Sequence, residues 1–77
     1  MKTIDREDLH FIGLYRGIEQ YEVLSDMSLL VLKLGDNYYL SKCDDWRNGG
    51  YNANIMNRIY NFYSIGVEAL GEKIKII

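Results

Sequence analysis

Hydrophobic and polar positions predict strands in the first part of the chain. Leu29–Leu34 and Tyr38–Lys42 are apolar or aromatic runs on either side of Gly35-Asp36-Asn37, a segment typical of a β-hairpin turn. Upstream, Tyr21–Leu24 has the composition of another strand, and Ser25-Asp26 supplies turn residues between the two. These three strands, consecutive in the sequence, predict an antiparallel β-meander.

The length of the hairpin loop determines which side chains share a face. A three-residue loop, from Gly35 to Asn37, pairs Leu34 with Tyr38 and Leu32 with Leu40. Asn37 tolerates the left-handed conformation that the third position of such a loop needs. The sequence therefore predicts a core face made of Leu30, Leu32, Leu34, Tyr38 and Leu40.

A helix is predicted over residues 52–64. After the breaker cluster at 47–50, apolar residues recur in two adjacent stripes at helical spacing: Ile55, Ile59 and Phe62, and Met56, Tyr60 and Tyr63. Asn52 is a suitable N-cap, and Gly66 suits the left-handed position that ends a helix. Residues 73–77 then alternate between lysine and isoleucine, which predicts a final edge strand protected by its lysines.

Residues 4–20 fit two structures. Ile4, Phe11 and Ile18 lie on a helical stripe, but a helix through them would contain Gly13 and Gly17 at a cost of about 1 kcal/mol each. We therefore favour a short helix from Ile4 to about His10, followed by a strand. One long helix is the alternative.

The elements together predict an α+β fold in a single domain, residues 1–77. It consists of a small antiparallel β-meander of about three to five strands, with one amphipathic helix (about 52–64) packed on one face and a short N-terminal helix. Apolar residues make up 48% of the chain and charged residues 26%, a balance typical of a globular domain rather than a disordered chain.

Composition and charge indicate the compartment in which the protein works and the partners that it does not suit. The longest apolar run is far shorter than the roughly 20 residues that span a bilayer, and the acidic N-terminal residues lack the apolar core of a signal peptide. Cys43 is the single cysteine, so no internal disulfide forms, which is typical of a reducing compartment. We expect a cytoplasmic protein that does not enter a membrane. The net charge of −2 argues against a nucleic-acid partner.

Residues that usually carry chemistry at pH 7 are scarce. The chain has seven tyrosines but one histidine, His10, and one cysteine, and neither has companions at the spacing of a zinc site or a nucleophile–base pair. Asp44 and Asp45 are adjacent, so in an extended segment they would point in opposite directions and would not converge on one substrate. We expect no enzymatic activity, no metal site and no cofactor.

Recognition residues gather in one segment of the sequence and on the helix that follows it. Trp46, Arg47 and Tyr51 lie in a Gly- and Asn-containing loop, and tryptophan, tyrosine and arginine dominate interface hot spots. The predicted helix then carries a polar face. The predicted partner-binding residues are Trp46, Arg47, Tyr51, Asn54, Asn57, Arg58 and Asn61. The alternative is that Trp46 and Tyr51 only cover the end of a small core.

These residues favour a small non-enzymatic protein-binding module. The leading interpretation is an inhibitor or accessory factor of bacterial or phage origin, of the anti-defence (anti-CRISPR-like) kind, that occludes a site on a larger protein. A nucleic-acid-binding accessory protein and a structural homo-oligomer, such as a homodimer, are the alternatives. A different working surface would be acidic and would imitate a phosphate backbone through Asp5, Glu7, Asp8, Glu19 and Glu22.

Overall fold

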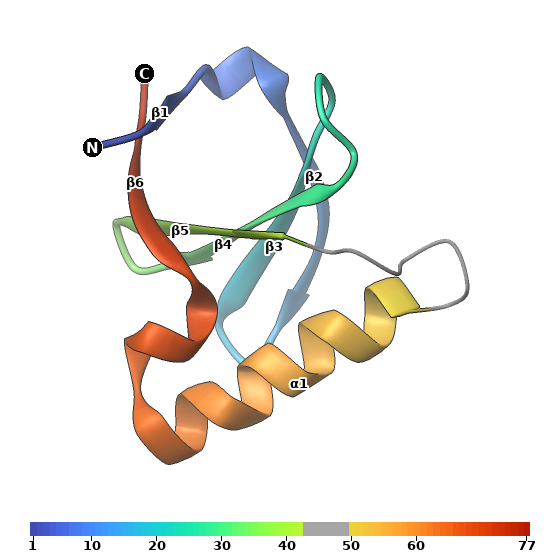
Figure 1. Ribbon diagram of the computed structural model, residues 1–77, viewed down its shortest axis with the longest axis vertical. Helices are drawn as coiled ribbons and strands as arrows, with labels where there is room; N and C mark the ends of the chain where they lie inside the picture. The colour runs from blue at the N-terminus through green and yellow to red at the C-terminus, as the bar shows by residue number, and fades with distance from the viewer. Residues whose placement is uncertain (43–49) are drawn as a thin grey trace.

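The computed structural model of the chain describes residues 1–42 and 50–77, and the side chains of 1–42 and 58–77. The described residues form a mixed sheet and a single α-helix, which lies in the C-terminal half of the chain (Figure 1). The elements in chain order are β1 (Thr3–Ile4), the 3₁₀ helix η1 (Arg6–Asp8), β2 (Leu9–Tyr15), β3 (Ile18–Val23), β4 (Leu29–Leu34), β5 (Asn37–Lys42), α1 (Gly50–Ile65), the 3₁₀ helix η3 (Val67–Leu70) and β6 (Glu72–Ile76).

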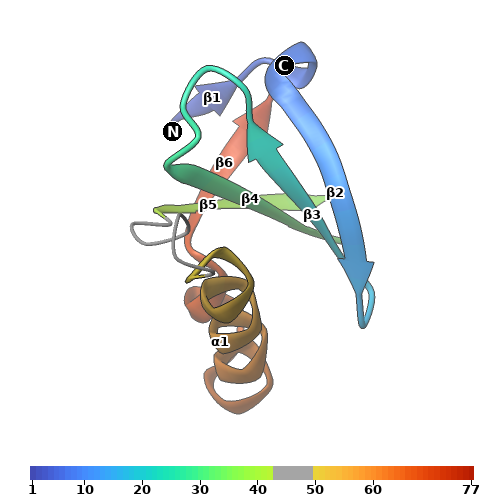
Figure 2. The same ribbon diagram turned by 90° about the vertical axis from the view of Figure 1, so that its right-hand side faces the viewer.

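The sheet is strongly curled. Its six strands follow the order β1-β6-β5-β4-β3-β2, so the first two strands of the chain lie at opposite ends of the order. Only the short η1 segment joins them, which requires the sheet to curl until its two ends meet at one corner (Figure 2). Backbone hydrogen bonds fix this corner, since the Arg6 amide donates to the Ile77 carbonyl at 2.8 Å and the Leu24 amide donates to the Asp8 carbonyl at 2.8 Å.

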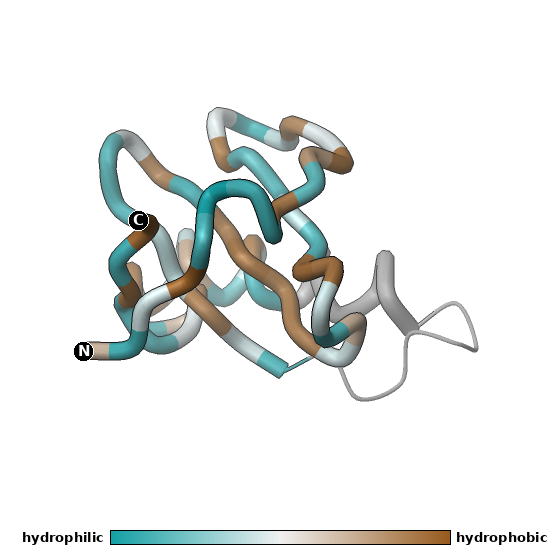
Figure 3. The backbone as a smooth tube through the Cα atoms, turned by 90° about the horizontal axis from the view of Figure 1, so that it is seen from above, coloured by the Kyte–Doolittle hydropathy of each residue, from teal (hydrophilic) through white to brown (hydrophobic). Residues whose placement is uncertain are grey.

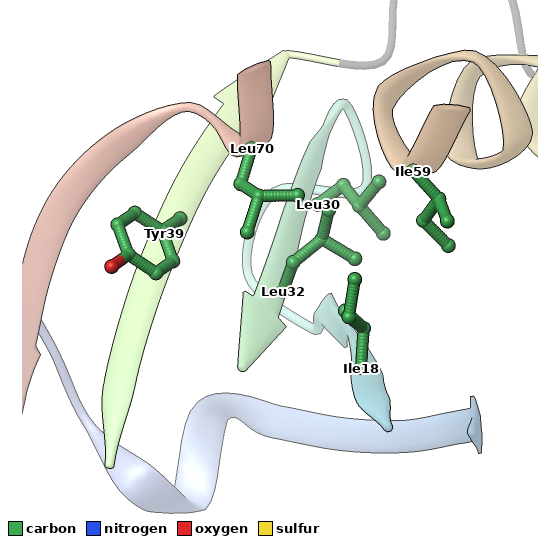
Figure 4. Close-up of a cluster of buried hydrophobic side chains, with 6 residues drawn as sticks. All are labelled: Ile18, Leu30, Leu32, Tyr39, Ile59 and Leu70. Atoms are coloured by element: carbon green, nitrogen blue, oxygen red, sulfur yellow. The ribbon is translucent and has the colours of Figure 1, made fainter. Parts of the chain in front are cut away.

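Both faces of β4 are buried, because its side chains alternate between two hydrophobic clusters. Leu30 and Leu32 point to the face that α1 covers, and the cluster there consists of Ile18, Leu30, Leu32, Tyr39, Ile59 and Leu70 (Figure 4). Val31 points to the other face, inside the curl, with Ile4, Val23, Leu40 and Ile74. In Figure 3 the hydrophobic stretches run through the middle of the molecule, while the η1 segment is hydrophilic.

The predicted hairpin is present, but its register is wrong by one residue. The loop has two residues, Gly35 and Asp36, so Leu34 pairs with Asn37 and Leu32 pairs with Tyr39. Gly35 has φ 61°, and a glycine with positive φ at the first loop position is the requirement of a type II′ turn. Leu40 and Tyr38 therefore lie on the face opposite Leu32, against the prediction.

The N-terminal region contains strands where a helix was expected. The predicted helix from Ile4 to His10 is replaced by β1 and the three-residue η1, and the single long helix is also wrong. The final strand, β6, is not an edge, because β1 pairs with it in parallel at Lys75 and Ile76. The sheet therefore has six strands rather than three to five, and it is mixed rather than purely antiparallel.

The predicted helix is confirmed, and the two described residues of its second stripe are exposed. It begins at Gly50, two residues before the predicted cap, and ends before Gly66, whose φ is 96°. Ile59 is buried and Phe62 is half-buried against the sheet, whereas Tyr60 and Tyr63 are 57% and 52% exposed. Among the described residues, no helix combines the length and the apolar character that are needed to cross a bilayer.

Candidate protein-binding surface

The predicted binding residues are only partly visible. Trp46 and Arg47 lie outside the described residues, and for Tyr51, Asn54 and Asn57 the structure describes the helical backbone but not the side chain. The two remaining residues differ in role. Asn61 is exposed, whereas Arg58 is half-buried and its Nη2 donates a hydrogen bond to the Lys42 carbonyl at 2.9 Å. Arg58 thus ties α1 to the end of β5.

The predicted acidic surface is divided among three places. Asp5, Glu7 and Asp8 lie together beside Ser25 around an open depression of about 310 Å³, and the Ser25 amide donates to Asp8 at 3.0 Å. Glu19 and Glu22 are on β3, three residues apart in a regularly paired strand, so they point to opposite faces of the sheet. The five carboxylates therefore do not form one surface.

Each of the two carboxylates on β3 has a local partner. His10 lies 2.6 Å from Glu22. The Tyr21 hydroxyl donates to Glu19 at 2.9 Å, and Lys33 Nζ lies 3.3 Å from the same carboxylate. The Tyr21 hydrogen bond, assisted by Lys33, lowers the pKa of Glu19. Burial, followed by the hydrogen bond to Glu19, raises the pKa of Tyr21. Lys33 balances the charge of Glu19, and both carboxylates already have partners within the sheet.

A cluster of tyrosine and arginine side chains lies where the β2–β3 turn meets α1. The Arg16 guanidinium carbon is 5.5 Å from the centre of the Tyr15 ring and 5.7 Å from the centre of the Tyr63 ring. The Tyr63 hydroxyl also donates to the Arg16 carbonyl at 3.3 Å. Cation–π contacts of this kind hold a guanidinium in place and leave its N–H edge accessible.

Arg16 occupies a backbone position that does not favour arginine. It has φ 50° and Gly17 has φ 83°, so both residues of the two-residue loop between Tyr15 and Ile18 have positive φ. Such a type I′ turn prefers Asn, Asp or Gly at its first position, and an ordinary L-residue there costs roughly 1–2 kcal/mol. A costly residue at a turn suggests that its side chain has a use, because strain is concentrated at functional sites.

The exposed stripe of α1 extends this cluster. Tyr60 lies one helical turn before Tyr63 on the same side of the helix, and both rings are more than half exposed. Asn61, the one predicted binding residue that is both described and exposed, is adjacent to Tyr60 in the sequence. We call Tyr15, Arg16, Tyr60 and Tyr63 the tyrosine–arginine cluster.

Sequence reasoning missed this cluster, although one signal for it was present. Arg16-Gly17 between two apolar or aromatic segments fits a two-residue hairpin loop, but the ambiguity over residues 4–20 concealed it. In the described residues, no group of three or more His, Cys, Asp or Glu side chains is placed to hold a metal ion. No family model, curated protein or solved structure matches the chain.

Proposed function

We propose that the protein is a non-enzymatic protein-binding module and that the tyrosine–arginine cluster is part of its working surface. The observation that carries this proposal is the position of Arg16 between the rings of Tyr15 and Tyr63, on a turn whose backbone disfavours it. Tyrosine and arginine are enriched among the residues that contribute most to protein–protein binding.

The geometry lowers the entropic cost of binding. A free arginine side chain loses up to about 2 kcal/mol of rotamer entropy when it is fixed in an interface. Arg16 already rests on two rings, so less of its freedom remains to be lost. Its guanidinium N–H groups suit a carboxylate or a backbone carbonyl on the partner. The exposed faces of Tyr60 and Tyr63 supply apolar area beside it.

The mode of action that we propose is occlusion of a site on a larger protein in the cytoplasm, as an inhibitor or accessory factor of bacterial or phage origin. The lone Cys43 suits a reducing compartment such as the cytoplasm. Trp46 and Arg47, which lie outside the described residues, stay predicted partner-binding residues.

Affinity capture with matched variants tests the proposal. The wild-type chain, Arg16→Asn and Tyr60→Ala are immobilised and exposed to lysate of the native bacterial host. Arg16→Asn removes the guanidinium but keeps a residue that tolerates positive φ, so the turn is preserved. Lys75→Ala, an exposed change on β6, is the control. We expect one protein retained by the wild type and by Lys75→Ala and at least about tenfold less by the other two variants.

Two results would contradict the proposal. The first is equal retention of every protein by all four immobilised chains, provided that circular dichroism shows each of them folded. The second is retention of nucleic acid in place of protein, lost as salt is raised, which would favour the nucleic-acid-binding alternative.

A further inference from the structure

The outer edge of β2 is an open side of the sheet. β2 is seven residues long and ends the strand order, with β3 on its inner side. Among the described residues, no strand pairs with its outer side, and Figure 2 shows β2 along the rim of the molecule. An unpaired strand edge presents backbone N–H and C=O groups that can pair with another strand.

The sequence of β2 lacks the usual protection of an edge strand. Leu9–Tyr15 contains no lysine, arginine, aspartate, glutamate or proline, and His10 is its one basic residue. Charged residues and proline are the common means by which proteins prevent edge-to-edge pairing. β2 has a bulge instead, where the register with β3 shifts between Phe11 and Gly13.

The bulge places two exposed apolar side chains on one face. Phe11 pairs with Tyr21 and Leu14 pairs with Glu19, and these two partners share a face of β3, where they are hydrogen-bonded to each other. Phe11 and Leu14 therefore also share that face, at 51% and 64% exposure. In a regular strand, residues three apart would point to opposite faces.

The backbone of the same two residues points outward. The Leu24 amide donates a hydrogen bond to the Asp8 carbonyl. In an antiparallel pair every second residue bonds the neighbouring strand, so His10 is the next β2 residue that bonds β3. Phe11 therefore directs its N–H and C=O to the open side. At the other end, the two-residue turn closes with a bonded pair at Tyr15 and Ile18, so Leu14 is also directed outward.

We infer that two copies of the chain pair antiparallel through β2, about a two-fold axis that passes between Ile12 and Gly13. This register places Phe11 opposite Leu14 of the second copy, and Leu14 opposite Phe11 of the second copy. Both outward-directed backbones then gain hydrogen bonds, and the exposed apolar side chains of both copies form one cluster on a common face. The strands meet without like charges, because β2 has none of the four charged residue types.

A second copy fits this edge better than an open-ended array does. The pairing uses the same strand on both chains, so it closes after two copies. The other edge of the sheet is β1, which has two residues and offers little to a further copy. A dimer also adds buried area to a chain whose own core is small, which is a common source of stability for domains of this size.

Sedimentation velocity with the full chain, from about 1 μM to about 1 mM, tests the inference. The wild-type mass should rise from 9.0 kDa toward twice that value as concentration increases. Leu14→Lys should raise the dissociation constant at least about tenfold, because it puts an ammonium group beside Phe11 of the second copy. Ile65→Lys is the matched control, since Ile65 ends α1 and is 65% exposed against 64% for Leu14, and it should dimerise like the wild type.

Hydrogen–deuterium exchange on the wild type provides a second measurement that needs no variant. The amides of Phe11 and Leu14 should exchange more slowly at high concentration than at low concentration. A wild-type mass of 9.0 kDa throughout, a mass beyond two copies, undiminished dimerisation of Leu14→Lys, or exchange at β2 that does not change with concentration would each overturn the inference.

Discussion

Replacement of Gly71 by alanine should destabilise the fold more than any other glycine substitution in the described residues. Gly71 lies between η3 and β6 with φ 121° and ψ −164°, a region that is essentially restricted to glycine. A Cβ atom there would lie 2.3 Å from the Leu40 carbonyl oxygen and 2.8 Å from its carbonyl carbon. Leu40 is in the core of the curl and pairs with Glu72, so its backbone has little freedom to retreat.

The cost has two separable contributions. A non-glycine residue in this backbone region costs about 1–3 kcal/mol, and forced contact with a packed backbone costs about a further 1–3 kcal/mol. A fold of 77 residues has a total stability of about 4–12 kcal/mol, so Gly71→Ala should remove a large fraction of it. Gly66→Ala is the matched control, because Gly66 has φ 96° and ψ −166° but no atom within 4 Å of the added Cβ.

Urea denaturation followed by far-ultraviolet circular dichroism measures both variants. Gly71→Ala should lower the midpoint by about 1 M or more, given a typical slope of about 1–3 kcal/mol per molar urea. Gly66→Ala should lose only the backbone contribution. Equal losses for the two variants would refute the argument from contact with Leu40, and a Gly71→Ala midpoint at the wild-type value would refute the whole account.

Three further predictions concern the core, the turn and pH. Leu32→Ala should cost about 2–5 kcal/mol in a denaturant melt, because Leu32 is fully buried. Lys33→Ala should cost much less, because Lys33 points to the opposite face and pairs with Glu19 near the surface; a larger loss for Lys33 would contradict the register. Arg16→Asn should be more stable than Arg16→Ala by about 1 kcal/mol, since both lose the ring contacts but only asparagine tolerates positive φ; equal stabilities would mean that the turn relaxes. The pKa of Glu19 is lowered in the fold, first by Tyr21, and the pKa of Asp26 is lowered by Ser28. Their stabilisation is therefore present above the ordinary carboxyl pKa of about 4 and is lost as the pH falls through the lowered values. The melting temperature of the wild type should fall as the pH drops below about 4. It should fall less steeply in the double variant Glu19→Gln with Asp26→Asn, and an equally steep fall in that variant would contradict the assignment to these two carboxyl groups.

The elements that local pattern specifies could be predicted from the sequence. The stripe that contains Ile59 and Phe62 predicted α1 because burial of one side of a helix imposes that spacing. The β4–β5 hairpin was predicted from two apolar runs on either side of a turn segment, but its register was not predicted correctly. Gly35 suits the first position of a two-residue loop and Asn37 suits the third position of a longer one, so turn chemistry alone did not decide between them.

Contacts between distant segments could not be predicted in this way. β1 has two residues and exists only because β6 lies beside it, so no local pattern indicates it. The curl of the sheet depends on that same pairing. Arg16 and Tyr63 are 47 residues apart and meet through tertiary packing. Arg58 was predicted to bind a partner. In the fold its Nη2 donates to the Lys42 carbonyl, and this contact also arises from tertiary packing.

The weakness of the pattern in β2 is itself informative. A strand whose faces and edges are all committed to the fold has a near-continuous apolar run, as in β4, where β3 and β5 lie on either side and Leu30, Val31 and Leu32 are fully buried. β2 has one open edge, a bulge and two exposed apolar side chains, so burial constrains its sequence less. Arg16, the first residue after β2, also conflicts with the residue preference of the turn. Local departures from pattern in an otherwise consistent chain are expected at functional sites. The segment that the sequence left ambiguous therefore carries both the proposed dimer edge and part of the proposed binding surface.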